Sequence, residues 1–371
     1  MIDAGQNTLR VIVPVASRFI SPQNTDWKYA AKTLPSLSSP QQGVQIVAQR
    51  NLYADAVSNL RYGLAIAHSR GIRLAPRAWN YALTQDCHLS LRDVKQAQAI
   101  LSYERYPDET FGLPVTWITS PTRRPNWSKS SLSEDDFERI VAWKRARAQK
   151  AAKLVFTTAV SLELFLEQSD PALRRLCSVI PFPILGISPI ADPRPKWNQP
   201  GLRLLFVGRE ARRKGLPTLL QAVVPLLQQD PSLHLTIVST LGDGPVSIPT
   251  LPNINHLRET SHNQVLQLMA QSHLLANPSL WESYGFVYVE AMSQGCVPMA
   301  LDSPVQRELI GSNGILLSSQ NPNEIQDALR QVICHREVYA TRAQRGLDSY
   351  LARHTTERIA AQFYEAIRST L

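Results

Sequence analysis

The chain has 371 residues, more than one hydrophobic core usually serves, so the length favours two domains. Apolar residues make up 44% of it, which indicates a globular protein, and its apolar runs are too short to span a bilayer. The net charge of +9, from 39 basic and 30 acidic residues, suits an anionic ligand, an anionic membrane surface or nucleic acid about equally. Charge alone therefore excludes none of these partners.

The first half alternates short apolar runs, several of them β-branched, with helix-like segments. This alternation predicts a parallel sheet with crossover helices. The predicted strands are residues 9–15, 44–48, 100–103, 115–119 and 154–158, and the predicted helices include 55–68 and 133–150.

Six prolines then crowd residues 181–200, a composition that prevents a regular helix. We interpret residues 186–200 as a linker between a first domain, 1–185, and a second, 201–354. The last helix, about 355–371, is expected to pack back on the first domain. In the second half the predicted strands are 202–207, 233–238, 274–276, 297–301 and 315–317, and the predicted helices are 217–229, 286–292, 322–334 and 355–367.

The most informative segment is 281–298, which places two carboxylates around a glycine turn at the start of a helix. Gly285 permits a tight turn, and the backbone amides at such a helix start can hold an anion. Glu282 precedes the helix and Glu290 lies within it. Their carboxylates can therefore accept hydrogen bonds from hydroxyl groups on either side of a bound diphosphate. Taken alone, a pair of glutamates is weak evidence, since a surface loop and an exposed helix position explain it as well.

A basic loop, residues 208–215, follows the first strand of the second half. Ligands of open α/β sheets bind at the carboxyl ends of parallel strands. Arg209 can make a bidentate contact with a diphosphate, and Lys214 a point-charge contact. A solvated basic turn explains the spacing equally well.

Several other chemistries lack their motifs. Two aspartates separated by one residue do not occur, and the histidines and cysteines are scattered, so we expect no metal and no cofactor. A Walker A loop and a Gly-x-Ser-x-Gly elbow are also missing. A second basic loop, residues 119–129, suggests contact with a phosphate on the acceptor as a hypothesis. The basic end of the helix at 133–153 suggests contact with anionic lipid as another. The first residues lack the basic segment followed by an apolar segment that is typical of a secretion signal. This predicts a cytoplasmic protein, and a peripheral location at a membrane is the alternative.

Taken together, the second half resembles the retaining glycosyltransferases of family 4, which have the α/β GT-B fold of two Rossmann-like domains facing a central cleft. An ordered set of motifs is far more specific than any one of them. The matching pieces, in family order, are 207–209, 214–215, 242–245, 277–282, Gly285, 290–292, Gly295, Pro298, Glu308 and 313–314.

This resemblance implies roles for particular residues. Arg209 and Lys214 would hold the donor diphosphate, Glu282 would contact the sugar, and Glu290 would bind ribose hydroxyls. Amides near Gly285, Phe286 and Val287 would help to hold the sugar and the phosphate. As the catalytic set we therefore take Glu282, Arg209 and Lys214.

The chain also departs from the family pattern. Ser283 and Tyr284 stand where proline and phenylalanine are frequent, and Ser303 and Pro304 stand where a glycine pair often precedes the glutamate matched by Glu308. The first domain lacks the usual glycine-rich loop after its first strand, and residues 103–105 lie near the place of a frequent histidine. The acceptor side therefore gives no readable pattern.

The sequence thus predicts a metal-independent, retaining glycosyltransferase that moves a sugar from a nucleoside diphosphate sugar to an unidentified hydroxyl acceptor. One alternative is a nucleotide-sugar epimerase or hydrolase of the same fold. Another is a glycosyltransferase-like protein that binds without turnover. Nucleic-acid binding rests on charge alone and is not expected.

Overall fold

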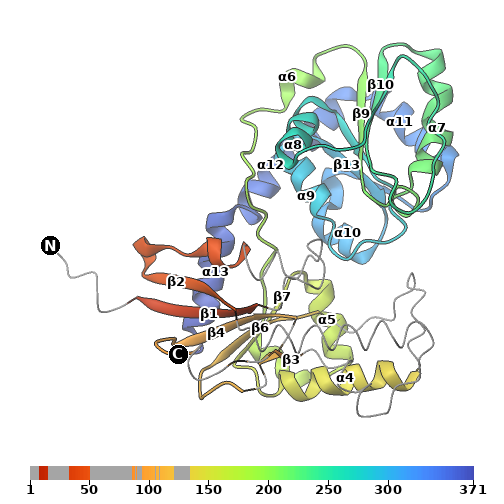
Figure 1. Cartoon of the computed structure of the whole chain (residues 1–371). Helices are drawn as coiled ribbons and strands as arrows, with labels where there is room; N and C mark the ends of the chain where they lie inside the picture. Colours follow the sequence, from red (N-terminus) through yellow and green to blue (C-terminus); the bar gives the residue numbers. More distant parts are fainter. Residues whose placement is uncertain are drawn as a thin grey trace. The chain divides into compact units, whose positions relative to one another are not determined.

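The computed structural model describes residues 8–15, 33–50, 86–87, 89, 94–104, 106–107, 109–120 and 134–371. The chain divides into two compact units, Met1–Pro183 with Thr356–Leu371 and Ile184–Thr355 (Figure 1). The expected helix at 55–68, most of the basic loop at 119–129 and the segment after the first strand lie outside the described residues.

The first unit contains a six-stranded parallel sheet in the order β2-β1-β4-β6-β7-β8. All five predicted strands are confirmed, with ends shifted by at most two residues. The sheet strands are β1 (Leu9–Val15), β2 (Val44–Arg50), β4 (Ala99–Tyr103), β6 (Val115–Ile118), β7 (Lys153–Phe156) and β8 (Cys177–Val179), and β3 (Asp86–Cys87) pairs separately with β5 (Tyr106–Pro107).

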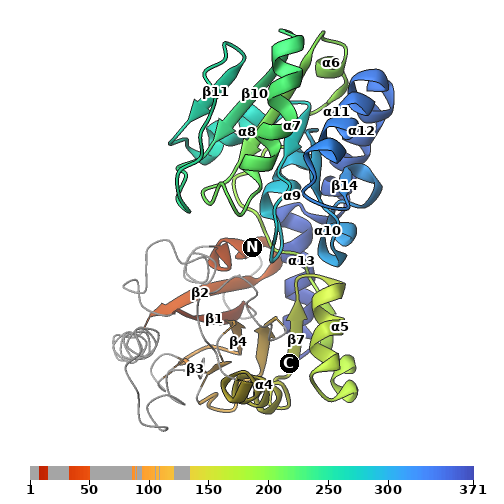
Figure 2. The same ribbon diagram turned by 90° about the vertical axis from the view of Figure 1, so that its right-hand side faces the viewer.

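Helices α4 (Glu134–Ala148) and α5 (Ala159–Glu167) connect the last three strands of this sheet (Figure 2). Three short 3-10 turns also occur: η3 (Pro35–Leu37), η4 (Pro40–Gln42) and η5 (Pro171–Leu176). The core contains aromatic pairs: the Trp117 ring packs edge-on against Tyr106 and Trp143, and the Phe156 ring lies tilted against Phe165. Edge-to-face pairs of this kind stabilise a core beyond their buried area.

The basic end of α4 makes contacts inside the first unit. The ammonium of Lys144 is buried, donates to the carbonyl of Ser120 at 2.7 Å and pairs with Glu104 at 3.4 Å. Arg145 donates to the carbonyl of Gln168, and Arg147 lies over the Tyr106 ring. Three of the basic residues near the end of α4 thus have contacts inside the unit, whereas Lys150 is exposed, and contact with anionic lipid stays a hypothesis.

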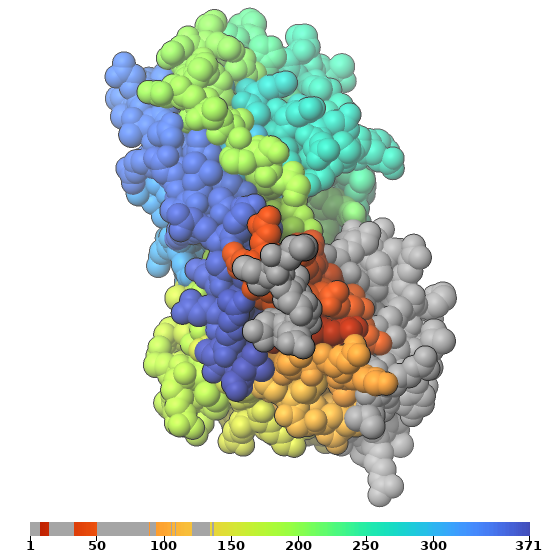
Figure 3. All heavy atoms as spheres, turned by 90° about the vertical axis from the view of Figure 1, so that its left-hand side faces the viewer, coloured from red at the N-terminus to blue at the C-terminus, as the bar shows by residue number. Residues whose placement is uncertain are grey.

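Helix α13 (Thr356–Arg368) belongs to the first unit although it ends the chain. Its buried Tyr364 hydroxyl donates to the carbonyl of Leu37, and Arg368 donates to the carbonyl of Gln42 at 2.6 Å. Figure 3 shows this helix, in dark blue, beside the orange residues of the first unit. The chain therefore returns to its first unit after completing the second.

The second unit contains six parallel strands in the order β11-β10-β9-β12-β13-β14. Numbered from β9, this is the order 3-2-1-4-5-6 of a doubly wound sheet. The strands are β9 (Leu202–Val207), β10 (Leu233–Val238), β11 (Ile254–Leu257), β12 (Leu274–Ala276), β13 (Val297–Leu301) and β14 (Ile315–Leu317). The helices are α6 (Arg194–Trp197), α7 (Leu216–Gln229), α8 (His262–Gln271), α9 (Phe286–Ser293), α10 (Pro304–Leu309), α11 (Pro322–Cys334) and α12 (Arg336–Arg353), with a 3-10 turn η6 (Gly311–Asn313).

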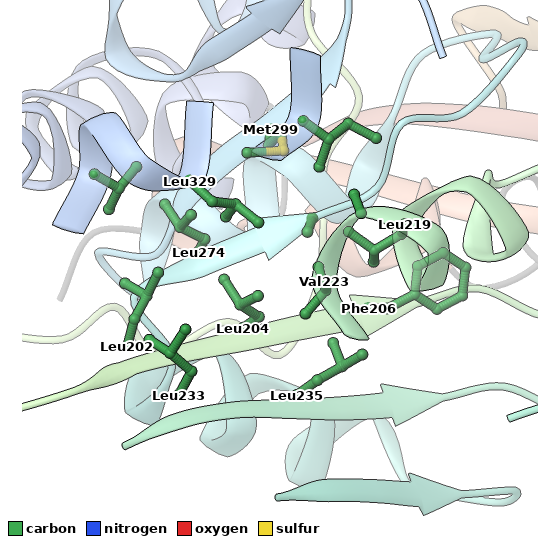
Figure 4. Packing of buried hydrophobic residues seen from close by; sticks show 14 of the residues in the cluster. Leu202, Leu204, Phe206, Leu219, Val223, Leu233, Leu235, Leu274, Met299 and Leu329 are labelled. Atoms are coloured by element: carbon green, nitrogen blue, oxygen red, sulfur yellow. The ribbon is translucent and has the colours of Figure 1, made fainter. Parts of the chain in front are cut away.

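The core of this unit lies between the sheet and helix α7 (Figure 4). Apolar residues of α7 recur at the helical spacing, so that Leu219 and Val223 face Leu204 and Phe206 of β9. Burial of one such side chain stabilises the fold by roughly 1.5–3 kcal/mol. This packing fixes the loop between β9 and α7, because both of its ends are held in the core.

The proline-rich segment that the sequence presents as a linker is part of the second unit from Ile184 onward. Its short helix α6 buries Trp197 and Lys196. The Lys196 ammonium donates to the carbonyls of Gln294 at 2.9 Å, Ala270 at 3.2 Å and Met269 at 3.3 Å. Gln294 is the C-cap of α9, and Met269 and Ala270 lie in the last turn of α8. A cation at the carboxyl ends of two helices is favoured by their dipoles, although burial lowers the pKa of Lys196 to about 8.

Candidate functional site

The carboxyl ends of β9 and β12 meet at the point where the strand order of the second sheet reverses. Asn277, directly after β12, joins the two ends: its side-chain amide donates to the carbonyl of Val207 at 2.6 Å and accepts the Val207 amide at 3.1 Å. Asn277 is fully buried. Ligands of open α/β sheets bind in the crevice at such a point, so the two loops that start here form the candidate site.

The first loop, residues 208–215, approaches the second loop closely at Gly215. This glycine has a φ of +86°, and a Cβ there would lie 2.4 Å from the carbonyl oxygen of Pro278. No side chain fits at that distance. Glycine is therefore required both for the backbone conformation and for the contact between the loops.

Asp243, in the glycine turn after β10, holds the first loop from the other side. Its carboxylate accepts the backbone amides of Arg212 at 3.1 Å and Arg213 at 2.8 Å. Arg212 in turn donates to the carbonyl of Pro245 at 2.7 Å. The predicted glycine turn at 241–245 thus has a structural task, since it anchors the basic loop.

Arg213 connects the basic loop to the segment that contains Glu282. Its guanidinium pairs with Glu210 at 2.6 Å, donates to the carbonyl of Trp281 and lies 5.7 Å from the centre of the Trp281 ring. Its own carbonyl accepts the amide of Leu280 at 2.9 Å. Sequence reasoning assigned Arg213 no role, because a run of basic residues does not show which of them face inward.

Lys214 and Glu282 form an ion pair across the two loops. Their side chains are 14% and 11% exposed, so the pair is mostly removed from water. Gly208 lies against the Lys214 stem, since a Cβ there would be 2.7 Å from its Cγ. The structure thus brings together two of the three residues predicted to be catalytic, 68 positions apart in the chain. Charge pairs in a low-dielectric site interact strongly, so each group sets the orientation of the other.

Arg209, the third of these residues, lies exposed in the same loop. Its carbonyl accepts the amide of Gly242 at 2.8 Å, which fixes the backbone from which its side chain extends.

Helix α9 begins at Phe286, as predicted, and Gly285 is its N-cap. The φ of Gly285 is +98°, and a Cβ would lie 2.6 Å from the Tyr288 ring. No side chain caps this helix start, where Phe286 and Val287 form the first turn. The Tyr288 hydroxyl donates to the carbonyl of Asn277 at 2.7 Å, and burial raises its pKa. Tyr288 therefore ties the helix start to the end of β12.

Glu290 lies one turn further along α9 and pairs with His262, the first residue of α8. The distance from its Oε1 to the imidazole Nε2 is 3.0 Å. The bond to Glu290 raises the pKa of His262. Sequence reasoning did not find His262, because 28 residues separate the two side chains and only the packing of α8 on α9 brings them together.

The departure at Ser303 and Pro304 has a local explanation. Ser303 is the N-cap of α10, its side chain accepts the amide of Gln306 at 3.2 Å, and Pro304 occupies the first turn, where its missing amide is not needed. Gln306 is 3% exposed, and both polar atoms of its side chain lack a hydrogen-bond partner among the described residues. Its Oε1 would lie 3.3 Å from a Cβ at Gly285, so a primary amide stands beside the start of α9.

Among the described residues, histidine, cysteine and acidic side chains form no group of three that could hold a metal ion. The helices in this part of the chain include none long and apolar enough to cross a membrane.

Residues 201–335 match the family model described as Glycosyl transferases group 1. Relatives include the gpi3 subunit of phosphatidylinositol N-acetylglucosaminyltransferase of Schizosaccharomyces pombe, 27% identical over 42% of this chain and 35% of the relative. The D-inositol 3-phosphate glycosyltransferase of Nocardioides is 30% identical over 35% of this chain and 33% of the relative. The matched segments thus span about a third of these relatives.

Solved structures match over the whole length. HepE of Anabaena in complex with UDP aligns with a TM-score of 0.59 and 15% identity, covering 98% of this chain and all of the other. Sucrose-phosphate synthase of Thermosynechococcus elongatus also has a TM-score of 0.59 and 15% identity, with 97% and 98% covered. The expected α/β GT-B fold is confirmed. The chain therefore has the GT-B fold, and its residues 201–335 match the family model of the group 1 glycosyl transferases.

Proposed function

We propose that this protein is a glycosyltransferase of the retaining family 4 type, which moves a sugar from a nucleoside diphosphate sugar to a hydroxyl acceptor. The observation that carries the proposal is the ion pair of Lys214 and Glu282, placed between two loops at the switch point of a doubly wound sheet. A cation for a phosphate and a carboxylate for a sugar hydroxyl stand side by side there.

In the proposed reaction, the bond between the anomeric carbon and the diphosphate breaks while the acceptor oxygen forms its bond to that carbon from the same face, and the acceptor hydroxyl gives its proton to the departing diphosphate. Negative charge then builds on the departing diphosphate. Lys214 and Arg209 stabilise that charge, and preorganised charges of this kind contribute strongly to catalysis. Glu282 keeps its orientation through Lys214 and accepts a sugar hydroxyl, whereas the amides at Gly285, Phe286 and Val287 face the sugar and phosphate.

Glu290 takes the ribose hydroxyls in this proposal. Glu290 lies one turn beyond the start of α9, whereas Glu282 precedes that helix. The nucleoside and the sugar lie on opposite sides of the diphosphate, so their two carboxylates must also be separated. Solved structures of HepE contain UDP or UDP-glucose, which makes uridine diphosphate sugars the first donors to test here.

The test is a thermal-shift panel of UDP-, GDP- and ADP-sugars. A ligand at about 100 times its dissociation constant adds roughly 2.7 kcal/mol, enough to raise the melting temperature by a few degrees. We expect a shift with one donor class that is lost in Arg209→Ala and Glu290→Ala. Arg330→Ala, which removes an exposed arginine of α11, is the matched control and should keep the shift. Absence of a shift with every donor would contradict the proposal.

Product analysis separates the alternatives. Consumption of the donor without an acceptor indicates an epimerase or hydrolase, and binding without consumption indicates a non-catalytic protein. The proposed transfer needs no divalent ion, so its rate should be the same with and without a chelator.

A further inference from the structure

The pair of Glu290 and His262 joins the proposed nucleoside end of the site to a second helix. The side chain of Glu290 is 14% exposed and that of His262 is 45% exposed, so the carboxylate is mostly buried and the imidazole is the more accessible partner. The Glu290 carboxylate has two oxygens, and the contact with His262 engages Oε1. His262 itself is fixed at the start of α8, because Ser261 and Gln264 form a complete capping box there.

The electrostatic surroundings of His262 are simple. Helices α8 and α9 carry no other charged side chain, and their remaining titratable group is the buried Tyr288. Arg258 and Glu259 are exposed in the turn before α8. Arg203 of β9, which also packs against α8, donates to the carbonyl of Gln271 at the opposite end of that helix. Glu290 is therefore the charge that acts on His262.

We propose that His262 is a positioning residue of the nucleoside subsite, which fixes the Glu290 carboxylate in the orientation that accepts the ribose diol. This inference rests on the proposed function, in which Glu290 binds ribose. A carboxylate on a free glutamate samples many rotamers, and holding one oxygen at 3.0 Å removes much of that freedom before the ligand arrives. Oε2 and the second lone pair of Oε1 remain as acceptors for the two hydroxyls.

The proposal gives donor binding a pH dependence of definite sign. Protonated imidazole makes a charge-assisted bond to Glu290, which is stronger than the bond from neutral imidazole. The bond to Glu290 raises the pKa of His262 above its usual value near 6.5, so this stronger bond persists toward neutral pH and weakens as pH rises through the raised pKa. Affinity for the donor should therefore be higher at pH 6 than at pH 8.5.

The experiment is calorimetric titration of UDP-glucose, or of the donor class that the thermal-shift panel identifies, between pH 6 and pH 8.5. A nucleotide sugar is the right probe because its phosphates do not titrate in this range, whereas the terminal phosphate of UDP does. The variants are His262→Ala and His262→Gln, since the glutamine amide nitrogen stands the same number of bonds from the backbone as Nε2. Their melting temperatures without ligand serve as the check on folding.

For the wild type we expect the dissociation constant to rise about fivefold from pH 6 to pH 8.5, which corresponds to roughly 1 kcal/mol for loss of charge assistance. His262→Ala should bind about fivefold or more weakly at pH 6, with a flat profile. His262→Gln should bind the donor at every pH with the affinity that the wild type has at pH 8.5.

A wild type that binds no nucleotide sugar would overturn the proposed function together with this inference. Binding by the wild type that His262→Ala reproduces in strength and pH profile would overturn the inference alone. So would an affinity that rises with pH, because His262 would then compete with ribose for Glu290 instead of positioning it.

Discussion

The proposed function gives the candidate site a diphosphate end and a nucleoside end, and each contains a carboxylate held by a basic side chain. At the diphosphate end, Lys214 and Glu282 connect two loops and are both mostly buried. At the nucleoside end, Glu290 and His262 connect two helices, and the histidine is half exposed. A lysine acts as a point charge, whereas a histidine changes its charge near neutral pH.

This difference predicts that the two ends respond differently to change. Removal of one partner from a mostly buried pair leaves an uncompensated charge, which is strongly destabilising, whereas a half-exposed pair is screened by water. Substitutions at the diphosphate end should therefore have large effects that depend little on pH. Effects at the nucleoside end should be modest and pH-dependent.

The largest expected effect follows from Glu282→Ala. It removes both the proposed sugar contact and the group that orients Lys214, so donor turnover should fall by a factor of about 100 or more. Turnover of the double variant Glu282→Ala with Lys214→Ala should be similar to that of either single variant, because the two residues act as a unit. Initial rates of donor consumption provide the measurement. Effects that multiply in the double variant would show that the pair does not act together.

Gly215→Ala tests the close approach of the two loops. The added Cβ meets a backbone carbonyl at 2.4 Å, so strain and displacement together should lower the free energy of unfolding by about 3 kcal/mol. Gly311→Ala is the matched control, since its φ is also positive, at +51°, but nothing lies within 4 Å of the new Cβ. The free energy of unfolding of Gly311→Ala should fall by about 1 kcal/mol. Thermal unfolding of both variants measures the difference, and equal losses would mean that the loops separate without resistance.

The smallest effect is a loss of stability in acid that originates away from the site. Buried His273 accepts the Arg203 amide at Nδ1 at 3.0 Å and donates from Nε2 to the carbonyl of Lys196 at 2.8 Å, so the contact with the Arg203 amide requires the neutral ring. Burial lowers its pKa to about 4. The unfolded chain therefore binds the extra proton between about pH 6.5 and 4, and stability falls as pH falls through that window.

Between pH 6.5 and 5 this loss amounts to about 2 kcal/mol. Melting temperatures across that range for the wild type and His273→Gln measure it, and the variant should show the shallower dependence. An equal dependence in both proteins would assign the effect elsewhere, for example to buried His354, whose pKa is also lowered by burial. Because His262 titrates in the opposite sense, this stability profile also separates folding from donor binding at the nucleoside end.

Much of the second sheet could be predicted from sequence. Five of its strands were predicted with their observed ends, because central parallel strands are short, continuous apolar runs between clear turns. Strand β11 was missed, since none of its four residues is buried and its pattern carries no strong signal. Helix α12 was also missed, although its buried residues recur at helical spacing, so a search for that period would have found it.

The candidate site was predicted less evenly. Gly285 was predicted to form a tight turn, whereas Gly215 was identified only as the end of the basic loop, and both have the positive φ that favours glycine. The partners of the named side chains were not predicted, because Arg213, Asn277, Asp243 and His262 become neighbours of the site through sheet order and helix packing. A linear pattern of charges does not say which of them face one another.

The sequence by itself determined the alternation of strands and helices and the tight turn at Gly285, because these depend on local periodicity and backbone freedom. The tertiary structure decided that Lys214 meets Glu282, that His262 meets Glu290 and that the proline-rich segment packs into the second unit. These contacts join residues far apart in the chain. They exist because the reversal of strand order at β9 and β12 brings two loops together and because α8 packs on α9.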